Sequence, residues 1–257
     1  LVSRKVDNMW LFETPKNYTE MCKKISTSVF WFVLIELFIL SQVSKEFSEL
    51  MKIISFNTEV EISSLKLYIS YIYIPIIFSI VENVFKMHDL FGRIFKIRRL
   101  FFGTVIFSEY IKQLKIEVKL SRLGLLKKYL KDENLQLNLR KHFYHHVSDE
   151  KTLIDNHYVY MALGSWCWVW IILDNFVFSI LLIIFTAIFG FYTKSLIIGL
   201  SVFCLFELCV VIVLLFTYCK KYSQKEVKCA VEYDSNNNSD KLNKELKKEI
   251  INALCNK

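Results

Sequence analysis

The stretch MALGSWCWVWIILDNFVFSILLIIFTAIF, residues 161–189, decides the fold, because it is mostly apolar and contains only one charged side chain. A membrane-spanning helix needs about 20 mostly apolar residues, and this stretch exceeds that length. Leu65–Phe85 and Leu196–Cys219 meet the same criterion, whereas Ser28–Val43 is marginal because it is short and contains Glu36. The sequence therefore predicts an all-α membrane protein, a multi-span helical bundle.

The composition of the whole chain agrees with insertion into a membrane. Of its 257 residues 54% are hydrophobic and 16% aromatic, and only 6 are Gly and 2 are Pro. Soluble domains contain about 45–50% apolar residues even when Gly is counted. An ordinary soluble domain is therefore excluded as the overall class.

The distribution of charge predicts the orientation of the spans. The loop 44–64 is acidic, whereas the long connection 87–160 and both ends of the chain are rich in Lys and Arg. Because Lys and Arg near span ends mark the cytoplasmic side, four spans with both termini in the cytoplasm are expected. The net charge of +8 then serves contact with anionic lipid headgroups, and no nucleic-acid partner is implied.

The chain divides accordingly into five segments. They are a cytoplasmic N-terminal segment (1–27), the first two spans with an acidic outer loop (28–86), a basic helical cytoplasmic connection (87–160), the last two spans (161–219) and a cytoplasmic amphipathic tail (220–257). In the connection, LFFGTVIFSEYI at 100–111 is too short to span and predicts an interfacial helix or the remnant of a span. Apolar residues at three- to four-residue spacing follow it, so long cytoplasmic helices are expected.

Four carboxylates are candidates for function because they lie in or near apolar spans. Ionisable groups are costly in a bilayer and mark functional sites by default. The alternative is that they pair with hydroxyl groups or are protonated where helices pack. The four are Glu36, Glu82, Asp174 and Glu207.

Catalysis is not expected. The segment RKHFYHHVSDE at 140–150 places Arg140 and His145 at the R-x-x-x-x-H spacing of a ribonuclease motif, in which His acts as base and Arg stabilises the phosphate. This spacing also arises by chance, and no Walker loop, G-x-S-x-G or G-x-G-x-x-G is present. The seven cysteines form no C-x-x-C pair and have no His at zinc-finger spacing, so neither a metal site, a cofactor nor a disulfide is expected.

The aromatic cluster WCWVWIILDNFVF at 166–178 has two interpretations. Its first tryptophans fit an interfacial belt. The deeper Trp170 and Phe178 fit an apolar ligand pocket between spans, with Asp174 as a polar group and Tyr73 of the second span beside them.

The end of the last apolar run resembles a known family. A span closing in LFTYC, a polar turn, then A-x-x-Y-x-S in AVEYDS at 230–235 and the basic amphipathic KLNKELKKEII are similar to the sixth span and following segment of insect odorant receptors. LRKHFYHHV at 139–147, DNMWLFE and FILSQV resemble other parts of that family. Asn237 stands where the family has Trp. Four spans instead of seven indicate a truncated or partial receptor.

The resemblance implies a function and partners. The chain would bind small volatile apolar odorants, lie in the plasma membrane and gate cations as a subunit together with a co-receptor. The cytoplasmic region would form the subunit interface, here Ala230, Tyr233, Leu242, Leu246 and Ile250. The alternative for this tail is an unstructured segment after Cys219.

A second resemblance points elsewhere. WVWIILD at 168–174 has the W-x5-D spacing of a membrane helix in multidrug-resistance ABC exporters. No nucleotide-binding domain follows it in this sequence, so the receptor is the preferred interpretation.

Overall fold

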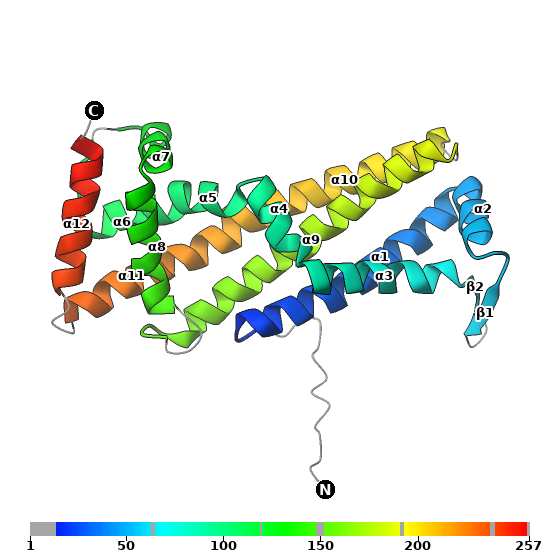
Figure 1. The fold of residues 1–257 in the computed structure, drawn as a ribbon, viewed down its shortest axis with the longest axis horizontal. Helices are drawn as coiled ribbons and strands as arrows, with labels where there is room; N and C mark the ends of the chain where they lie inside the picture. The colour runs from blue at the N-terminus through cyan, green and yellow to red at the C-terminus, as the bar shows by residue number, and fades with distance from the viewer. Residues whose placement is uncertain are drawn as a thin grey trace, which may run out of the picture. The chain divides into compact units, whose positions relative to one another are not determined.

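The computed structural model describes residues 14–62, 65–118, 120–147, 152–190, 193–236 and 240–255. They pack into two compact units. The first contains Thr19–Leu90 and Trp166–Leu214, and the second contains Phe91–Ser165 and the residues from Leu215 onward. Helices dominate both units (Figure 1), which confirms the all-α prediction at the level of class. The segment DNMWLFE lies outside the described residues.

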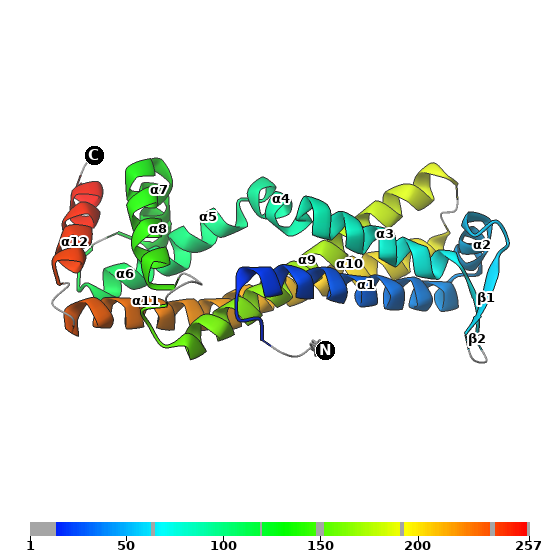
Figure 2. The same ribbon diagram turned by 60° about the horizontal axis from the view of Figure 1, so that its bottom comes forward.

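Long helices form the first unit, and polar and aromatic contacts join them. Its elements are α1 (Tyr18–Val43), α2 (Lys45–Ile54), β1 (Glu59–Ile62), β2 (Leu65–Tyr68), α3 (Ser70–Phe85), the start of α4 (Met87–Ile94), most of α9 (Asn156–Ile188) and α10 (Lys194–Leu214). Phe32 of α1 packs edge-to-face on Trp168 of α9, and Phe78 of α3 does the same on Phe178. Figure 2 shows α1 running alongside α9.

Three helices of the described chain are long and apolar enough to cross a membrane. They are Tyr18–Val43, Asn156–Ile188 and the continuous helix Lys194–Asn236, and a fourth span is possible only if α3 and α4, bent by 66°, are taken together. The first span was marginal in the sequence at Ser28–Val43. It is long enough in the structure because the helix already begins at Tyr18.

The predicted second span, Leu65–Phe85, is wrong in its first turn. Leu65–Tyr68 is a strand that pairs antiparallel with Glu59–Ile62, and the helix begins only at Ser70. Alternation in EVEI and LKLY is the strand period of two, and pairing satisfies the backbone of both segments. The remaining helix has 16 residues, about 24 Å at 1.5 Å per residue.

The first unit exposes an apolar surface and buries polar groups. Exposed large apolar side chains are frequent on its long helices: Ile76, Ile77, Ile80 and Val84 on α3, Ile180, Leu181 and Ile184 on α9, and Val202, Leu205 and Phe206 on α10. An apolar surface of this extent marks a membrane or protein contact. Together with the helix lengths it identifies a membrane protein.

The second unit is built around the apolar run 100–111. Its elements are α5 (Ile97–Phe101), the π-helix η1 (Phe102–Ile106), α6 (Phe107–Gln113), α7 (Arg122–Lys131), α8 (Glu133–Val147), the π-helix η2 (Leu215–Cys219), α11 (Lys220–Asn236) and α12 (Asp240–Cys255). Phe107 and Tyr110 are fully buried, and this segment packs against α7 and α11. The run is therefore the core of the unit, which corrects its interpretation as an interfacial helix or span remnant.

One glycine of this core permits close packing. A Cβ atom on Gly103 would lie 2.6 Å from Leu126 Cδ1 and 2.7 Å from Tyr129 Cδ1. Both distances are shorter than a van der Waals contact. Only glycine therefore lets η1 approach α7 this closely.

The described part of the tail is helical, as expected for an amphipathic segment, but it lacks the polar turn. The polar turn predicted after Cys219 is absent, because the helix continues without a break from Lys194 to Asn236. An unstructured tail is wrong for the described residues, since both α11 and α12 form and contact each other. Val227, Ala230 and Val231 are buried and form the apolar stripe of α11. This helix extends to Asn236.

Candidate functional site

An acid–amide cluster joins three helices of the first unit. We use this name for Glu36 of α1, Asn175 and Ser179 of α9, and Glu207 of α10, which are all buried. Asn175 Nδ2 donates to Glu36 Oε2 at 3.1 Å and also to Glu207 Oε1. Ser179 Oγ lies 2.6 Å from Glu36 Oε1 and 3.1 Å from Glu207 Oε2. Asn175 and Ser179 can serve both acids because they are one helical turn apart.

Ser179 cannot donate a hydrogen bond to both acids of this cluster. A serine hydroxyl has one proton, so Ser179 donates to one carboxylate only. Its second contact is a hydrogen bond only if the other carboxyl group carries a proton and donates to Oγ. Glu36 and Glu207 therefore fit the alternative to a functional role, in which buried carboxyl groups pair with polar side chains or are protonated where helices pack.

A second group of acids, the Glu82–Asp174 site, consists of Glu82, His88 and Asp174. Glu82 is in the last turn of α3, and Lys86 follows it in the left-handed conformation with φ 48°. The chain bends there, so that His88 of α4 returns toward α3 and its Nδ1 lies 2.5 Å from Glu82 Oε1. Asp174 comes from α9. The ligand atoms of the three side chains lie within 4.8 Å of one another.

The predicted ligand-binding residues are only partly brought together. Trp170, Asp174 and Phe178 are spaced by four along α9 and are buried on one face, as the helical repeat requires. Trp170 stacks on Trp166 with ring centroids 5.6 Å apart and lies 6.2 Å from the His88 ring. Tyr73 is separate from them, since its hydroxyl donates to the Ile54 carbonyl at the end of α2.

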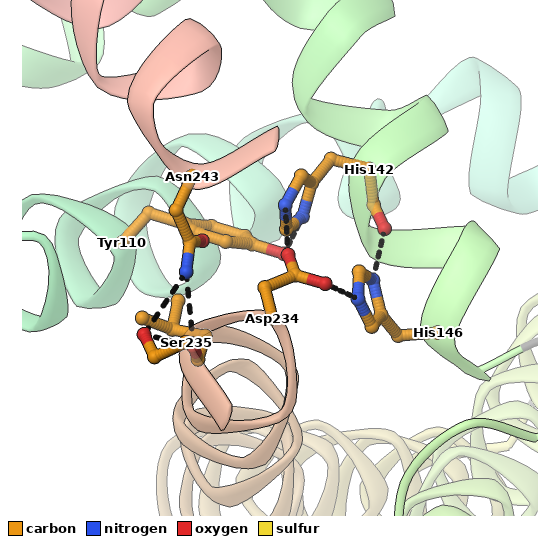
Figure 3. A network of polar contacts seen from close by, with 7 residues as sticks. Tyr110, His142, His146, Asp234, Ser235 and Asn243 are labelled. Carbon is orange, nitrogen blue, oxygen red and sulfur yellow. Dashed lines mark hydrogen bonds and ion pairs between the residues drawn. The ribbon is translucent and has the colours of Figure 1, made fainter. Parts of the chain in front are cut away.

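A His–Asp network occupies the second unit (Figure 3). We define it as Tyr110 of α6, His142 and His146 of α8, and Asp234 of α11. Asp234 Oδ2 is 3.0 Å from His142 Nε2, and its Oδ1 is 2.8 Å from His146 Nε2. Tyr110 Oη is 2.9 Å from His142 Nδ1, and His146 Nδ1 is 2.8 Å from the His142 carbonyl oxygen. His142, His146 and Asp234 also form a group whose ligand atoms lie within 4.8 Å.

The partners fix the protons of this network. Burial raises the pKa of the Tyr110 hydroxyl well above its ordinary value, so Tyr110 donates to His142 Nδ1. Burial, reinforced by the nearby His146 and opposed by Asp234, lowers the pKa of His142 to about 4, and neutral His142 donates from Nε2 to Asp234.

His146 differs from His142 because both of its ring nitrogens face oxygen atoms that can accept a hydrogen bond. Its Nδ1 faces a carbonyl oxygen, which can only accept a hydrogen bond, so Nδ1 carries a proton. Nε2 faces a carboxylate oxygen and needs a proton as well. Both ring nitrogens of His146 therefore have partners within the network, which joins α6, α8 and α11.

Comparison with known families assigns the chain. The model of the YmfE protein family matches residues 17–245. The chain belongs to the YmfE protein family. Comparison with curated proteins and with solved structures gives no match. The part matched to the YmfE protein family contains the acid–amide cluster, the Glu82–Asp174 site and the His–Asp network in full.

The alternative ribonuclease pair does not converge on one site. Arg140 and His145 are five positions apart on α8, about 140° around the helix axis. Arg140 lies over the Phe102 ring at 5.7 Å. His145 instead lines a groove of about 480 Å³ between α8 and α12.

The predicted interface residues have different environments. Ala230, Leu246 and Ile250 are buried in the packing of the second unit, whereas Leu242 is 40% exposed. Leu242 and Leu246 line the groove between α8 and α12. Tyr233 packs its ring on His146. The exposed part of this surface remains the predicted subunit contact.

Sequence reasoning missed the His–Asp network. His142 and His146 stand four apart in a segment with helical periodicity, which places both imidazoles on one face, and this signal was available. Asp234 is 92 residues from His142, and no local pattern connects the two. His88 was missed as well, because its approach to Glu82 depends on the bend at Lys86.

Proposed function

We propose that this member of the YmfE protein family is an odorant-receptor-like membrane subunit that binds small volatile apolar ligands. It would gate cations together with a co-receptor, in the plasma membrane with both ends of this chain in the cytoplasm. The proposal rests on the segment that ends the last apolar run and on the helix that follows it. Tyr218 and Cys219 end the last apolar run, and the A-x-x-Y-x-S sequence at 230–235 lies on the helix that continues from it.

The aromatic face of α9 supports a ligand site in this proposal. Trp170 and Phe178 are 1% and 6% exposed, and Asp174 lies between them on the same face. Volatile apolar ligands offer few hydrogen bonds, so their affinity must come mostly from apolar burial at about 25 cal/mol per Å². A buried aromatic face with one polar group suits such ligands and favours modest, broad selectivity.

Co-expression tests the proposal. The chain is expressed in cells with and without an insect odorant co-receptor, and calcium influx is recorded while a panel of volatile esters, alcohols, ketones and terpenes is applied. We expect responses only with both proteins present. Equal responses without the co-receptor would contradict the partner, and surface expression with no response to any compound would contradict the receptor.

Two matched variants locate the ligand site. Phe178→Ala removes a buried ring from the aromatic face, and it should shift the concentration needed for half-maximal response about tenfold or more. Phe189→Ala removes a ring that is 58% exposed and should leave the response unchanged. Equal effects of the two substitutions would exclude the aromatic face as the ligand site.

A further inference from the structure

Three polar side chains of the first unit are buried together where α3 ends. Glu82 and His88 are each 1% exposed, and Asp174 is 0% exposed. They come from three different helices, and their ligand atoms lie within 4.8 Å of one another. The bend at Lys86 gives this convergence, because it directs His88 back to Glu82.

Several of these buried oxygen atoms have no partner. Both carboxylate oxygens of Asp174 and Oε2 of Glu82 accept no hydrogen bond from any described residue. An ionised carboxylate removed from water without compensation is very costly, and buried polar atoms are nearly always satisfied. Three unsatisfied oxygens at one place therefore indicate a missing positive group.

Protons alone leave this site incomplete. His88 can neutralise only Glu82, to which its Nδ1 is already directed at 2.5 Å. A proton on Asp174 donated to Glu82 Oε2 would satisfy two of the three oxygens and still leave one Asp174 oxygen without a partner among the described residues. A metal ion could take oxygens from both acids at once.

We propose that Glu82, His88 and Asp174 bind a divalent metal ion. Two carboxylates and one imidazole neutralise a charge of +2 and are the ligand types of Zn²⁺ and Mn²⁺. Ca²⁺ fits less well, because it takes 6–8 oxygen ligands. Ligand atoms on one tetrahedral Zn²⁺ ion lie about 3.3 Å apart, as bonds of about 2.0 Å require, so side-chain shifts on the order of 1 Å complete the set.

The surroundings of His88 fit the role of a metal ligand. A ligating histidine usually directs its second ring nitrogen to another polar group, which fixes the ring. His88 Nε2 lies 3.9 Å from Asp89 Oδ1 and 3.9 Å from Cys22 Sγ. On binding, the metal ion displaces the proton of Nδ1, so that binding releases a proton to solvent.

Metal content tests the proposal on the full chain in detergent micelles without odorant, so its outcome is independent of the receptor function. The protein is stripped with a chelator, incubated with Zn²⁺ or Mn²⁺, dialysed and analysed by elemental mass spectrometry. We expect one tightly held ion per chain, lost in Asp174→Asn and in His88→Asn.

Two control variants separate this site from other carboxylates and histidines. Glu36→Gln changes a buried acid of the same unit whose oxygens have partners, and His142→Asn changes the His–Asp network. Both should keep the ion. An ion that disappears in His142→Asn and remains in Asp174→Asn would place the metal in the His–Asp network and overturn the proposal, as would a native chain that retains none.

A third variant distinguishes the loss of a metal ligand from a failure to fold. Asp174→Cys keeps a ligand at the same position and adds a thiolate, so Co²⁺ bound there should show a sulfur-to-cobalt charge-transfer band that native protein lacks. Bound Co²⁺ without this band in a folded Asp174→Cys chain would contradict Asp174 as a ligand.

Discussion

The Glu82–Asp174 site and the His–Asp network are made of the same chemical groups, yet they differ in whether every buried atom has a partner. In the network, a carboxylate of α11 accepts from two imidazoles of α8, and each imidazole is oriented by a second contact. At the other site, one imidazole faces two acids, and three carboxylate oxygens have no partner among the described residues. Burial alone therefore does not mark a functional site, because the hydrogen bonds within the His–Asp network already account for the burial of its polar side chains.

The acid-to-amide substitution should have its largest effect in the His–Asp network. Asp234→Asn removes the buried carboxylate that pairs with both His142 and His146, and breaking one partner of a buried pair costs about 3–5 kcal/mol. Denaturant unfolding of the detergent-solubilised protein measures the change. Glu245→Gln alters an acid that is 60% exposed and paired with the exposed Lys241, and its effect should stay within about 0.5 kcal/mol.

Acid should weaken the network through His142. Its pKa is about 4 in the folded protein, against an ordinary value of 6.5, so the unfolded chain binds this proton first as the pH falls. The contribution is fully present above pH 6.5, decreases below it and is lost under pH 4, about 3 kcal/mol in all. The contribution is measured as the difference between the free energies of unfolding at pH 7 and pH 4.5. If the same difference is found in His142→Asn, another group is responsible for it.

The same acid-to-amide change should have the opposite sign at the Glu82–Asp174 site. With a chelator present, Asp174→Asn keeps the size of the side chain and supplies an amide donor near the unsatisfied Glu82 Oε2. We expect the free energy of unfolding to rise by about 1–3 kcal/mol. A decrease in the free energy of unfolding as large as that caused by Asp234→Asn would contradict the proposed difference between the two sites.

The bend that positions His88 should show the smallest effect. Lys86 has φ 48°, a conformation that costs an L-residue about 1–2 kcal/mol and that glycine adopts freely. Part of this gain is offset, because glycine has a greater conformational entropy in the unfolded chain. Lys86→Gly should therefore stabilise the folded protein by about 0.5–1 kcal/mol. Lys86→Ala keeps a Cβ atom and should not increase the stability. Equal unfolding midpoints for the two variants would contradict the proposal that the backbone at Lys86 is strained.

The helices could be predicted because their signal is local. Residues 161–189 and 196–219 are apolar over the length of a span, and the structure has helices there. The strand Leu65–Tyr68 could not be separated from the apolar run after it, because a hairpin is defined by pairing with Glu59–Ile62. The helical core at 100–111 was also misinterpreted, since its partner α11 is more than 100 residues away in the sequence.

The candidate sites show the same limit. Glu36, Glu82, Asp174 and Glu207 were recognisable as costly acids, but the rotation and register of the helices decide which of them find partners. Glu36 and Glu207 share Asn175 and Ser179, whereas Asp174, one residue before Asn175, lies on another face of α9. No sequence pattern distinguishes these outcomes.

The shortness of α3 has a consequence for the bilayer itself. Its 16 residues give about 24 Å of helix, whereas the hydrocarbon layer is about 30 Å thick. If α3 crosses the bilayer by itself, the lipid beside it thins, at a cost of fractions of a kcal/mol per Å. Water and headgroups then come closer to the end of α3, where Glu82 lies, and give ions in solution a shorter path to its carboxylate.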